Sequence, residues 1–201
     1  METKMNFCKF SKSGNSLIST ALFLGAALVA NAAFAAEAGK DQATLIKALA
    51  QSKISLIDGL RQATKGTEVP ISAKFELDDK GKLSLSVYTV EKGVSTDAEK
   101  NVLKELSGSP EQAKWTTEVE VFKDIPHVAR ASQQLALMSL SPFTLAEIAT
   151  KAQKAHPGTV FAITPAVRNQ KPVFIVLEAD KGKAVELVFG LLDGKLARAQ
   201  K

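Results

Sequence analysis

The feature that most constrains this chain is an internal correspondence between its two halves. At one constant shift, the segment SKISLIDGLRQATK from Ser52 lies over SPFTLAEIATKAQK from Ser141. Identities such as Leu56 with Leu145 are few, but the order of polar, apolar and turn positions agrees along the whole stretch. Such self-similarity predicts one supersecondary unit that is present twice.

Each unit is expected to begin with a helix. Ser55 and Thr144 stand at the candidate helix starts, and Asp58 and Glu147 follow three residues later. A hydroxyl followed at this spacing by an acid is the pattern of a capping box. Each helix carries a single apolar stripe, so it must pack against another element.

A sheet is the expected packing partner. After each helix the apolar period changes to two, which is typical of half-buried strands. Turn residues such as Asp79-Lys80-Gly81 separate the runs, which predicts antiparallel hairpins. The alternating runs occupy residues 71–77, 82–87, 117–122, 159–167, 172–179 and 184–192. Because TEVEVF at 117–122 resembles AVELVF at 184–189, the first unit is expected to carry an insert before its third strand.

Further helices are expected outside the two units. In the insert, about 94–115, Thr96 and Glu99 have the spacing of a capping pair, Leu103 and Leu106 lie on the expected apolar face, and Gly108 suits the helix end. A helix at 127–142 is expected to link the halves, with residues 41–50 as its counterpart before the first unit.

The expected fold class is therefore α+β, with two repeats of a helix packed on a three-stranded antiparallel sheet. Extra helices lie in the insert and the linker. The expected domains are a first repeat at 36–126, a linking helix at 127–142 and a second repeat at 143–201. One continuous sheet and two separate domains both fit this pattern.

Residues 1–35 resemble a secretory signal peptide. Lysines precede an apolar run at 17–30, and Ala33-Phe34-Ala35 offers a cleavage site. The alternative is an uncleaved membrane anchor, but the run is short and Asn31 follows it, so cleavage is favoured. We expect an exported protein, periplasmic or secreted, with no stable membrane insertion after cleavage.

Several chemistries are disfavoured by composition and motifs. Cys8 is the only cysteine and precedes the apolar run, so the mature chain would lack thiols. The net charge of +5 comes from lysines mixed with acids, which indicates a solvated surface rather than nucleic-acid binding. His127 and His156 lack nearby ligands at metal spacing. No phosphate-binding loop or G-x-S-x-G motif is present, so we predict no catalytic residue, cofactor or metal.

Trp115 is the one candidate contact residue. It follows the polar stretch SPEQAK and opens a strand, where an aromatic side chain can anchor a partner. The alternative is a lid over the core.

The second unit resembles a PepSY domain. Residues 145–200 show an alanine-rich helix, the turn Pro157-Gly158, a strand, a polar turn, the strand segment PVFIV, Lys181-Gly182 and a third strand. The first unit is similar apart from its insert. The resemblance implies an exported bacterial protein without catalytic residues that regulates or inhibits a secreted peptidase.

The leading hypothesis is a non-enzymatic module that binds another protein, such as a peptidase, through an exposed sheet surface or edge strand. The alternative is a small apolar ligand or lipid held between helix and sheet. An unrecognised hydrolase comes third, because no nucleophile and base are paired in the sequence.

Overall fold

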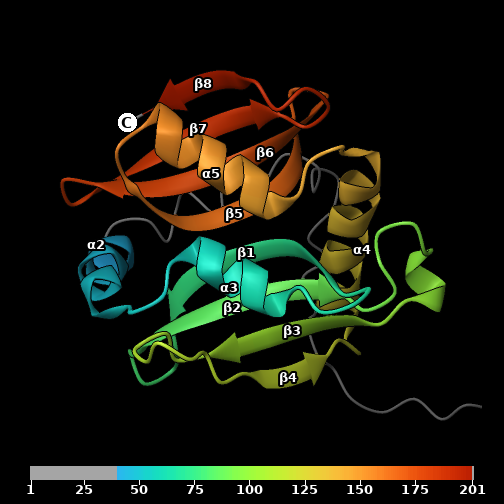
Figure 1. Ribbon diagram of the computed structural model, residues 1–201, viewed down its shortest axis with the longest axis horizontal. Coiled ribbons are helices and arrows are strands. Elements are labelled where there is room, and N and C mark those ends of the chain that lie inside the picture. The colour runs from blue at the N-terminus through green and yellow to red at the C-terminus, as the bar shows by residue number, and fades with distance from the viewer. Residues whose placement is uncertain (1–39, 201) are drawn as a thin grey trace, which may run out of the picture. The chain divides into compact units, whose positions relative to one another are not determined.

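Eight strands, each antiparallel to its neighbours, form one sheet in the described part of this protein (Figure 1). The computed structural model describes residues 40–200, so the signal peptide expected at 1–35 lies outside the described residues. The spatial order is β4-β3-β2-β1-β5-β6-β7-β8. The strands are β1 Val69–Leu77, β2 Leu83–Val90, β3 Leu103–Gly108, β4 Glu118–Val121, β5 Thr159–Arg168, β6 Lys171–Asp180, β7 Lys183–Gly190 and β8 Leu196–Gln200. The helices are α2 Lys40–Ala48, α3 Leu56–Ala63, α4 Ile125–Leu140 and α5 Leu145–Ala155, with 3-10 turns η1 Leu49–Gln51 and η2 Ala98–Lys100.

The expected fold class, two repeats of a helix on a three-stranded sheet, is wrong. Each half contributes four strands, and the two halves share one sheet because β1 pairs with β5. Ala73 lies opposite Ile163 and Lys74 lies opposite Ala162 at this seam. Two separate sheets would leave the backbone N–H and C=O groups of β1 and β5 unpaired along an edge, and joining the strands satisfies them.

The helix expected in the insert at 94–115 is also wrong. Only η2 is helical there, and the following residues form β3, which pairs along the outer side of β2. The Thr96 hydroxyl donates to the carbonyl of Lys92 rather than capping a helix. Leu103 and Leu106, whose spacing suggested a helix, are both buried because β3 is covered on both faces.

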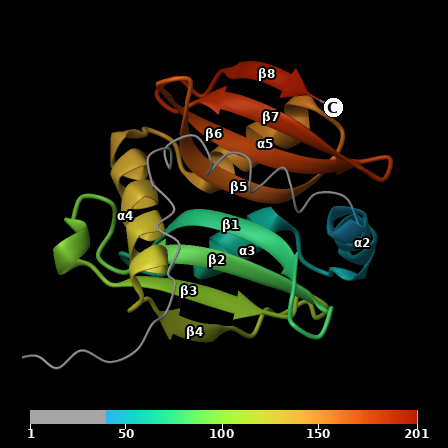
Figure 2. The same ribbon diagram turned by 180° about the vertical axis from the view of Figure 1, so that it is seen from behind.

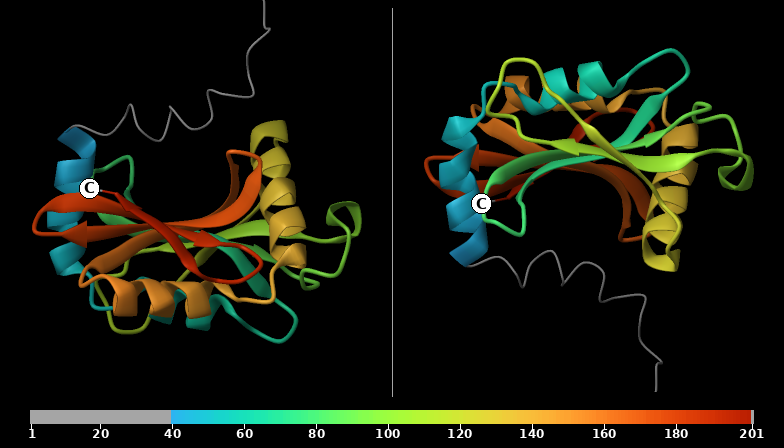
Figure 3. Two further views of the ribbon diagram at one scale, coloured as in Figure 1. Left: turned by 90° about the horizontal axis from the view of Figure 1, so that it is seen from above. Right: turned by 90° about the horizontal axis from the view of Figure 1, so that it is seen from below.

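Helices α3 and α5 lie side by side on one face of the sheet (Figure 3). Both expected capping boxes are confirmed: Ser55 Oγ accepts from the backbone N–H of Asp58, and Thr144 Oγ1 accepts from that of Glu147. Helix α3 approaches the sheet so closely that a Cβ on Gly59 would lie 2.4 Å from Leu85. The apolar stripes therefore pack directly on the strands.

The linking helix α4 lies across the seam between the halves (Figure 2). Its buried Gln134 contacts both halves at once. The Oε1 atom accepts from Ser72 Oγ of β1 at 3.0 Å, and Nε2 donates to Thr164 Oγ1 of β5 at 3.1 Å. One amide thus holds together the two strands that pair only briefly with each other.

The core continues without interruption from one half to the other. One row of directly opposed residues crosses all eight strands on the face that α3 and α5 cover. It consists of Val119, Leu106, Val87, Ala73, Ile163, Val176, Leu187 and Ala199. The six interior members are buried and the two end members are exposed. The sheet is therefore well covered in its centre and uncovered at both edges.

Candidate functional site

The outer edge of β4 is the first candidate site. All four residues of β4 are exposed, including Val119 at 58% and Val121 at 45%. The backbone N–H of Phe122 donates to the carbonyl of Leu103. Because the direction of backbone groups alternates along an antiparallel strand, the N–H and C=O groups of Val119 and Val121 point away from β3. No strand of residues 40–200 pairs with these backbone groups, which lie beside two exposed apolar side chains.

Trp115 lies beside this edge, but its side chain is only 7% exposed. Its Nε1 donates to the carbonyl of Gly108 at 3.3 Å. The ring covers the core between β3 and β4, which agrees with the alternative interpretation of Trp115 as a lid over the core. It also lines an open groove of about 410 Å³, whose other lining residues are Gln62, Thr64, Lys65, Leu106, Lys114 and Thr117. Trp115 therefore shapes the floor of a groove next to β4.

The two faces of β4 differ in chemistry. Val119 and Val121 belong to the face that carries the groove, whereas Glu118 and Glu120 point to the opposite face. Lys65 and Lys114 at the groove supply positive charge. An extended segment alongside β4 would therefore meet apolar side chains on one face and acidic side chains on the other.

The opposite edge of the sheet, β8, was not expected from the sequence. Its five residues are all exposed, and Arg198 and Gln200 share the face of Val188 and Glu186 on β7. The expected equivalence of residues 117–122 with 184–189 does not hold by position, because β4 is outermost whereas β7 is covered by β8. Within the part of the chain that the structure describes, the two free edges of the sheet are therefore β4 and β8.

His127 has an acidic partner that the sequence analysis missed. Its Nδ1 lies 2.8 Å from Asp124 Oδ1, and that carboxylate also accepts from the backbone N–H of His127. This backbone hydrogen bond at the start of α4, followed by that to the ring, lowers the pKa of Asp124. The imidazole stacks on Phe122 with ring centroids 5.2 Å apart. The histidine belongs to a helix cap.

His156 also has an acidic partner, and this one is buried. Its Nδ1 lies 2.8 Å from Glu178 Oε2, and its Nε2 lies 3.8 Å from Asp180 Oδ2. The Glu178 side chain is 0% exposed and its Oε1 has no hydrogen-bond partner among the described residues. Burial raises the pKa of Glu178, and the hydrogen bond with His156 opposes that shift.

One signal in the sequence indicates that Glu178 needs a buried partner, although it does not identify His156 as that partner. Glu178 lies on the same inward-facing side of β6 as Phe174 and Val176. Burying an acid there is unfavourable unless it has a polar partner. The fold supplies that partner at the C-cap of α5, 22 residues earlier. The Glu178 carboxylate is fully buried, whereas the His156 side chain is 17% exposed. The described residues contain no group of three or more potential ligands that could hold a metal ion.

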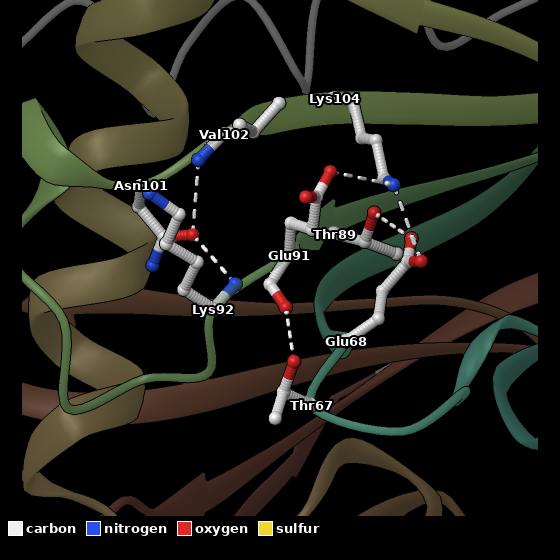
Figure 4. A network of polar contacts seen from close by, with 8 residues as sticks. All are labelled: Thr67, Glu68, Thr89, Glu91, Lys92, Asn101, Val102 and Lys104. Carbon is white, nitrogen blue, oxygen red and sulfur yellow. Dashed lines mark hydrogen bonds and ion pairs between the residues drawn. The ribbon is translucent and has the colours of Figure 1, made fainter.

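The third polar cluster joins the ends of β1, β2 and β3 (Figure 4). Lys104 Nζ lies 3.2 Å from Glu68 Oε2 and 3.4 Å from Glu91 Oε2. Thr89 Oγ1 donates to the other oxygen of Glu68 at 2.6 Å. Asn101 Oδ1 accepts from the backbone N–H groups of Lys92 and Val102, which closes the loop before β3. Lys104 thus bridges Glu68 and Glu91, and the cluster links the ends of the three strands.

Comparisons with known proteins leave the family open. No family model matches this chain, and no curated protein matches it. A crystal structure from Clostridium difficile 630, described as a "putative lipoprotein", aligns over 67% of this chain and 82% of that chain. The sequence identity is 12% and the TM-score is 0.36, which supports no conclusion about function. The resemblance to PepSY domains stays a prediction. None of the described helices has the length and apolar character needed to cross a membrane.

Proposed function

We propose that this chain is an exported, non-enzymatic protein, periplasmic or secreted, that binds an extended segment of a partner protein along the outer edge of β4. The observation that carries the proposal is the outward direction of the backbone N–H and C=O groups of Val119 and Val121. A strand added at such an edge gains main-chain hydrogen bonds, and alternate side chains give selectivity.

The surroundings of β4 support this function. The exposed valines form an apolar strip that leads to the groove lined by Trp115. A partner segment with apolar residues at alternate positions would place them on this strip, and basic residues between them would face Glu118 and Glu120. We propose a peptidase as the partner because the sequence resembles PepSY domains.

The small-ligand alternative is not favoured by the packing. Helices α3 and α5 meet the sheet through fully buried side chains, among them Leu60, Ala152 and Phe174. These side chains occupy the space between helix and sheet in which such a ligand would bind.

Site-specific photocrosslinking tests the proposal. A photoreactive residue is placed at position 119, and a second one at position 80 in the exposed turn between β1 and β2 serves as the control. We expect one envelope or secreted protein other than this chain to crosslink at position 119 only, through a segment that mass spectrometry identifies. Val119→Arg should abolish its binding, and Val167→Arg, at a valine that is 47% exposed on β5, should not.

The outcomes separate the two parts of the proposal. Absence of a crosslinked protein, or equal loss of binding in both arginine variants, would overturn binding at β4. A crosslinked protein without peptidase activity would leave edge binding intact and remove peptidase regulation.

A further inference from the structure

The two free edges of the sheet match each other. We propose that copies of this chain associate head to tail, with β8 of one copy pairing along β4 of the next. The two strands lie at opposite ends of the sheet (Figure 1). The partner at this interface is a second copy of the same chain, so the inference goes beyond the binding of another protein. At any one β4 the second copy and the partner protein would exclude each other, because both use the same backbone groups.

The direction of the strands permits this contact. The sheet has eight strands, and every neighbouring pair is antiparallel. With an even number of alternating strands, the two edge strands run in opposite directions. A second copy placed beside the first in the same orientation therefore brings β8 against β4 as an antiparallel pair, which continues the sheet.

The register follows from the rows that cross the sheet. The apolar row described above begins at Val119 on β4 and ends at Ala199 on β8. The adjacent row on the other face consists of Glu118, Ser107, Ser86, Lys74, Ala162, Leu177, Glu186 and Gln200. Continuing both rows into the next copy places Ala199 opposite Val119 and Gln200 opposite Glu118. The same register places Arg198 opposite Glu120.

The backbone groups are directed correctly for this register. The N–H and C=O groups of Val119 point away from β3, as shown above. Along a row of an antiparallel sheet, each residue bonds to the neighbour on one side only, so the bonded and unbonded pairs alternate. This alternation leaves the N–H and C=O groups of Ala199 on the outer side of β8. Val119 and Ala199 can therefore exchange two backbone hydrogen bonds.

The side chains at this register are complementary. Arg198 faces the acidic side of β4, where Glu120 lies directly opposite in a pair without mutual backbone hydrogen bonds, in which side chains approach most closely. On the other face, Ala199 meets the exposed Val119. A contact of β4 with a second β4, centred on that strand, would instead place Glu118 and Glu120 of the two copies face to face. Charge therefore favours β8 over a second β4.

Such a contact is heterologous, because it uses two different surfaces of the chain. Each strand is rotated by about 20–25° relative to its neighbour, so eight strands accumulate roughly 160–200° of twist. Successive copies are also displaced by about 38 Å along the sheet, at about 4.8 Å per strand. The displacement keeps two copies from closing on each other, so an open chain of copies results.

Sedimentation velocity with charge reversal tests the interface, using purified protein from cells that express the full chain. The parent is expected to form species larger than a dimer as its concentration rises from micromolar to millimolar. Glu120→Lys and Arg198→Glu should each weaken the association about tenfold, because an opposite-charge pair across two strands becomes a like-charge pair. Lys80→Glu, in the exposed turn between β1 and β2, is the matched control and should associate as the parent does.

Restoration of the pair distinguishes the interface from a general charge effect. An equimolar mixture of the two weakened variants should associate again. At the contact between them, the lysine introduced at position 120 of one variant lies opposite the glutamate introduced at position 198 of the other, and the unchanged Arg198 lies opposite the unchanged Glu120. The double variant that carries both reversals should also associate. Residues 120 and 198 are exposed, so these changes leave the core intact.

A parent that is monomeric at every concentration would overturn the inference, and so would a closed dimer or an association that resists both reversals. Because this experiment uses the purified protein alone, its failure would leave the binding of a partner protein at β4 untouched.

Discussion

The two halves of the sheet obtain their strand register in different ways. In the second half, β5, β6 and β7 are joined by the two-residue turns Asn169-Gln170 and Lys181-Gly182, in which every φ angle is positive. Turns of this kind match the twist of antiparallel strands and fix the register locally. In the first half, longer segments join β2 to β3 and β3 to β4, and the side chains of Asn101 and Trp115 hold them in place.

The contrast shows which residues determine strand register. In a tight turn these residues are adjacent in sequence, whereas Asn101 acts through hydrogen bonds to the backbone of Lys92 and Gly93, eight or nine residues earlier. The halves also differ in their buried charge. In the first half the nearly buried Glu68 is paired with Lys104, whereas Glu178 in the second half has one carboxylate oxygen without a partner among the described residues.

The largest expected effect tests whether the halves unfold together. Phe174 in the second half is fully buried, so Phe174→Ala should lower the free energy of unfolding by about 3–5 kcal/mol. Trp115, the only tryptophan, lies in the first half and reports its unfolding by fluorescence. We expect its transition to shift as far as the circular dichroism transition. An unshifted tryptophan signal would mean that the first half unfolds independently, and the exposed Leu192→Ala serves as the control.

The second effect concerns the seam that joins the halves. Gln134→Leu removes the amide that bonds both Ser72 and Thr164, so we expect a loss of about 1–3 kcal/mol in the free energy of unfolding. Amide hydrogen exchange should increase at Ala73 and Ile163 more than within either half. The neighbouring exposed Gln133→Leu should change stability by less than about 0.5 kcal/mol. Equal effects of the two variants would show that the amide does not hold the seam.

The smallest expected effect concerns the buried charge of the second half, through the pH dependence of the free energy of unfolding. Burial raises the pKa of Glu178 above its ordinary value of 4.5, and the charged groups that face it are His156 from the end of α5 and Asp180. A raised pKa in the folded state means that stability is fully present below pH 4.5 and is lost as the pH rises through the raised value.

Glu178→Gln removes this titration. The stability of the variant should therefore increase relative to the parent as the pH rises through that range, by about 1.4 kcal/mol for each unit by which the pKa is raised. Urea unfolding at a series of pH values measures the difference. A constant difference between the two proteins at all pH values would contradict the burial of a titrating carboxyl.

Local signals in the sequence predicted local structure well. The capping boxes at Ser55 and Thr144 and the hairpin strands of the second half were found because capping and turn chemistry involve residues close in sequence. The strand β3 was missed because the spacing of Leu103 and Leu106 fits a helix as well as a strand that is buried on both faces.

The missed features of the candidate site depend on tertiary contacts. No local pattern indicates that β1 pairs with β5, or that Glu178 meets His156. The sequence suggested Trp115 as a candidate contact residue, but only the structure shows that its side chain is buried while the neighbouring valines of β4 are exposed. Exposure of an edge strand is a property of the whole sheet order.

The place of α4 between the halves also bears on the order in which the chain folds. Gln134 lies 62 residues after Ser72 but only 30 residues before Thr164. Since the entropy lost on closing a loop grows with its length, the contact with β5 is the less costly one to form first. We expect α4 to pack on the second half first, because its tight hairpins form quickly. The strand β1 would then pair with the already formed β5. The halves would then reach the native state in reverse order of their position in the chain.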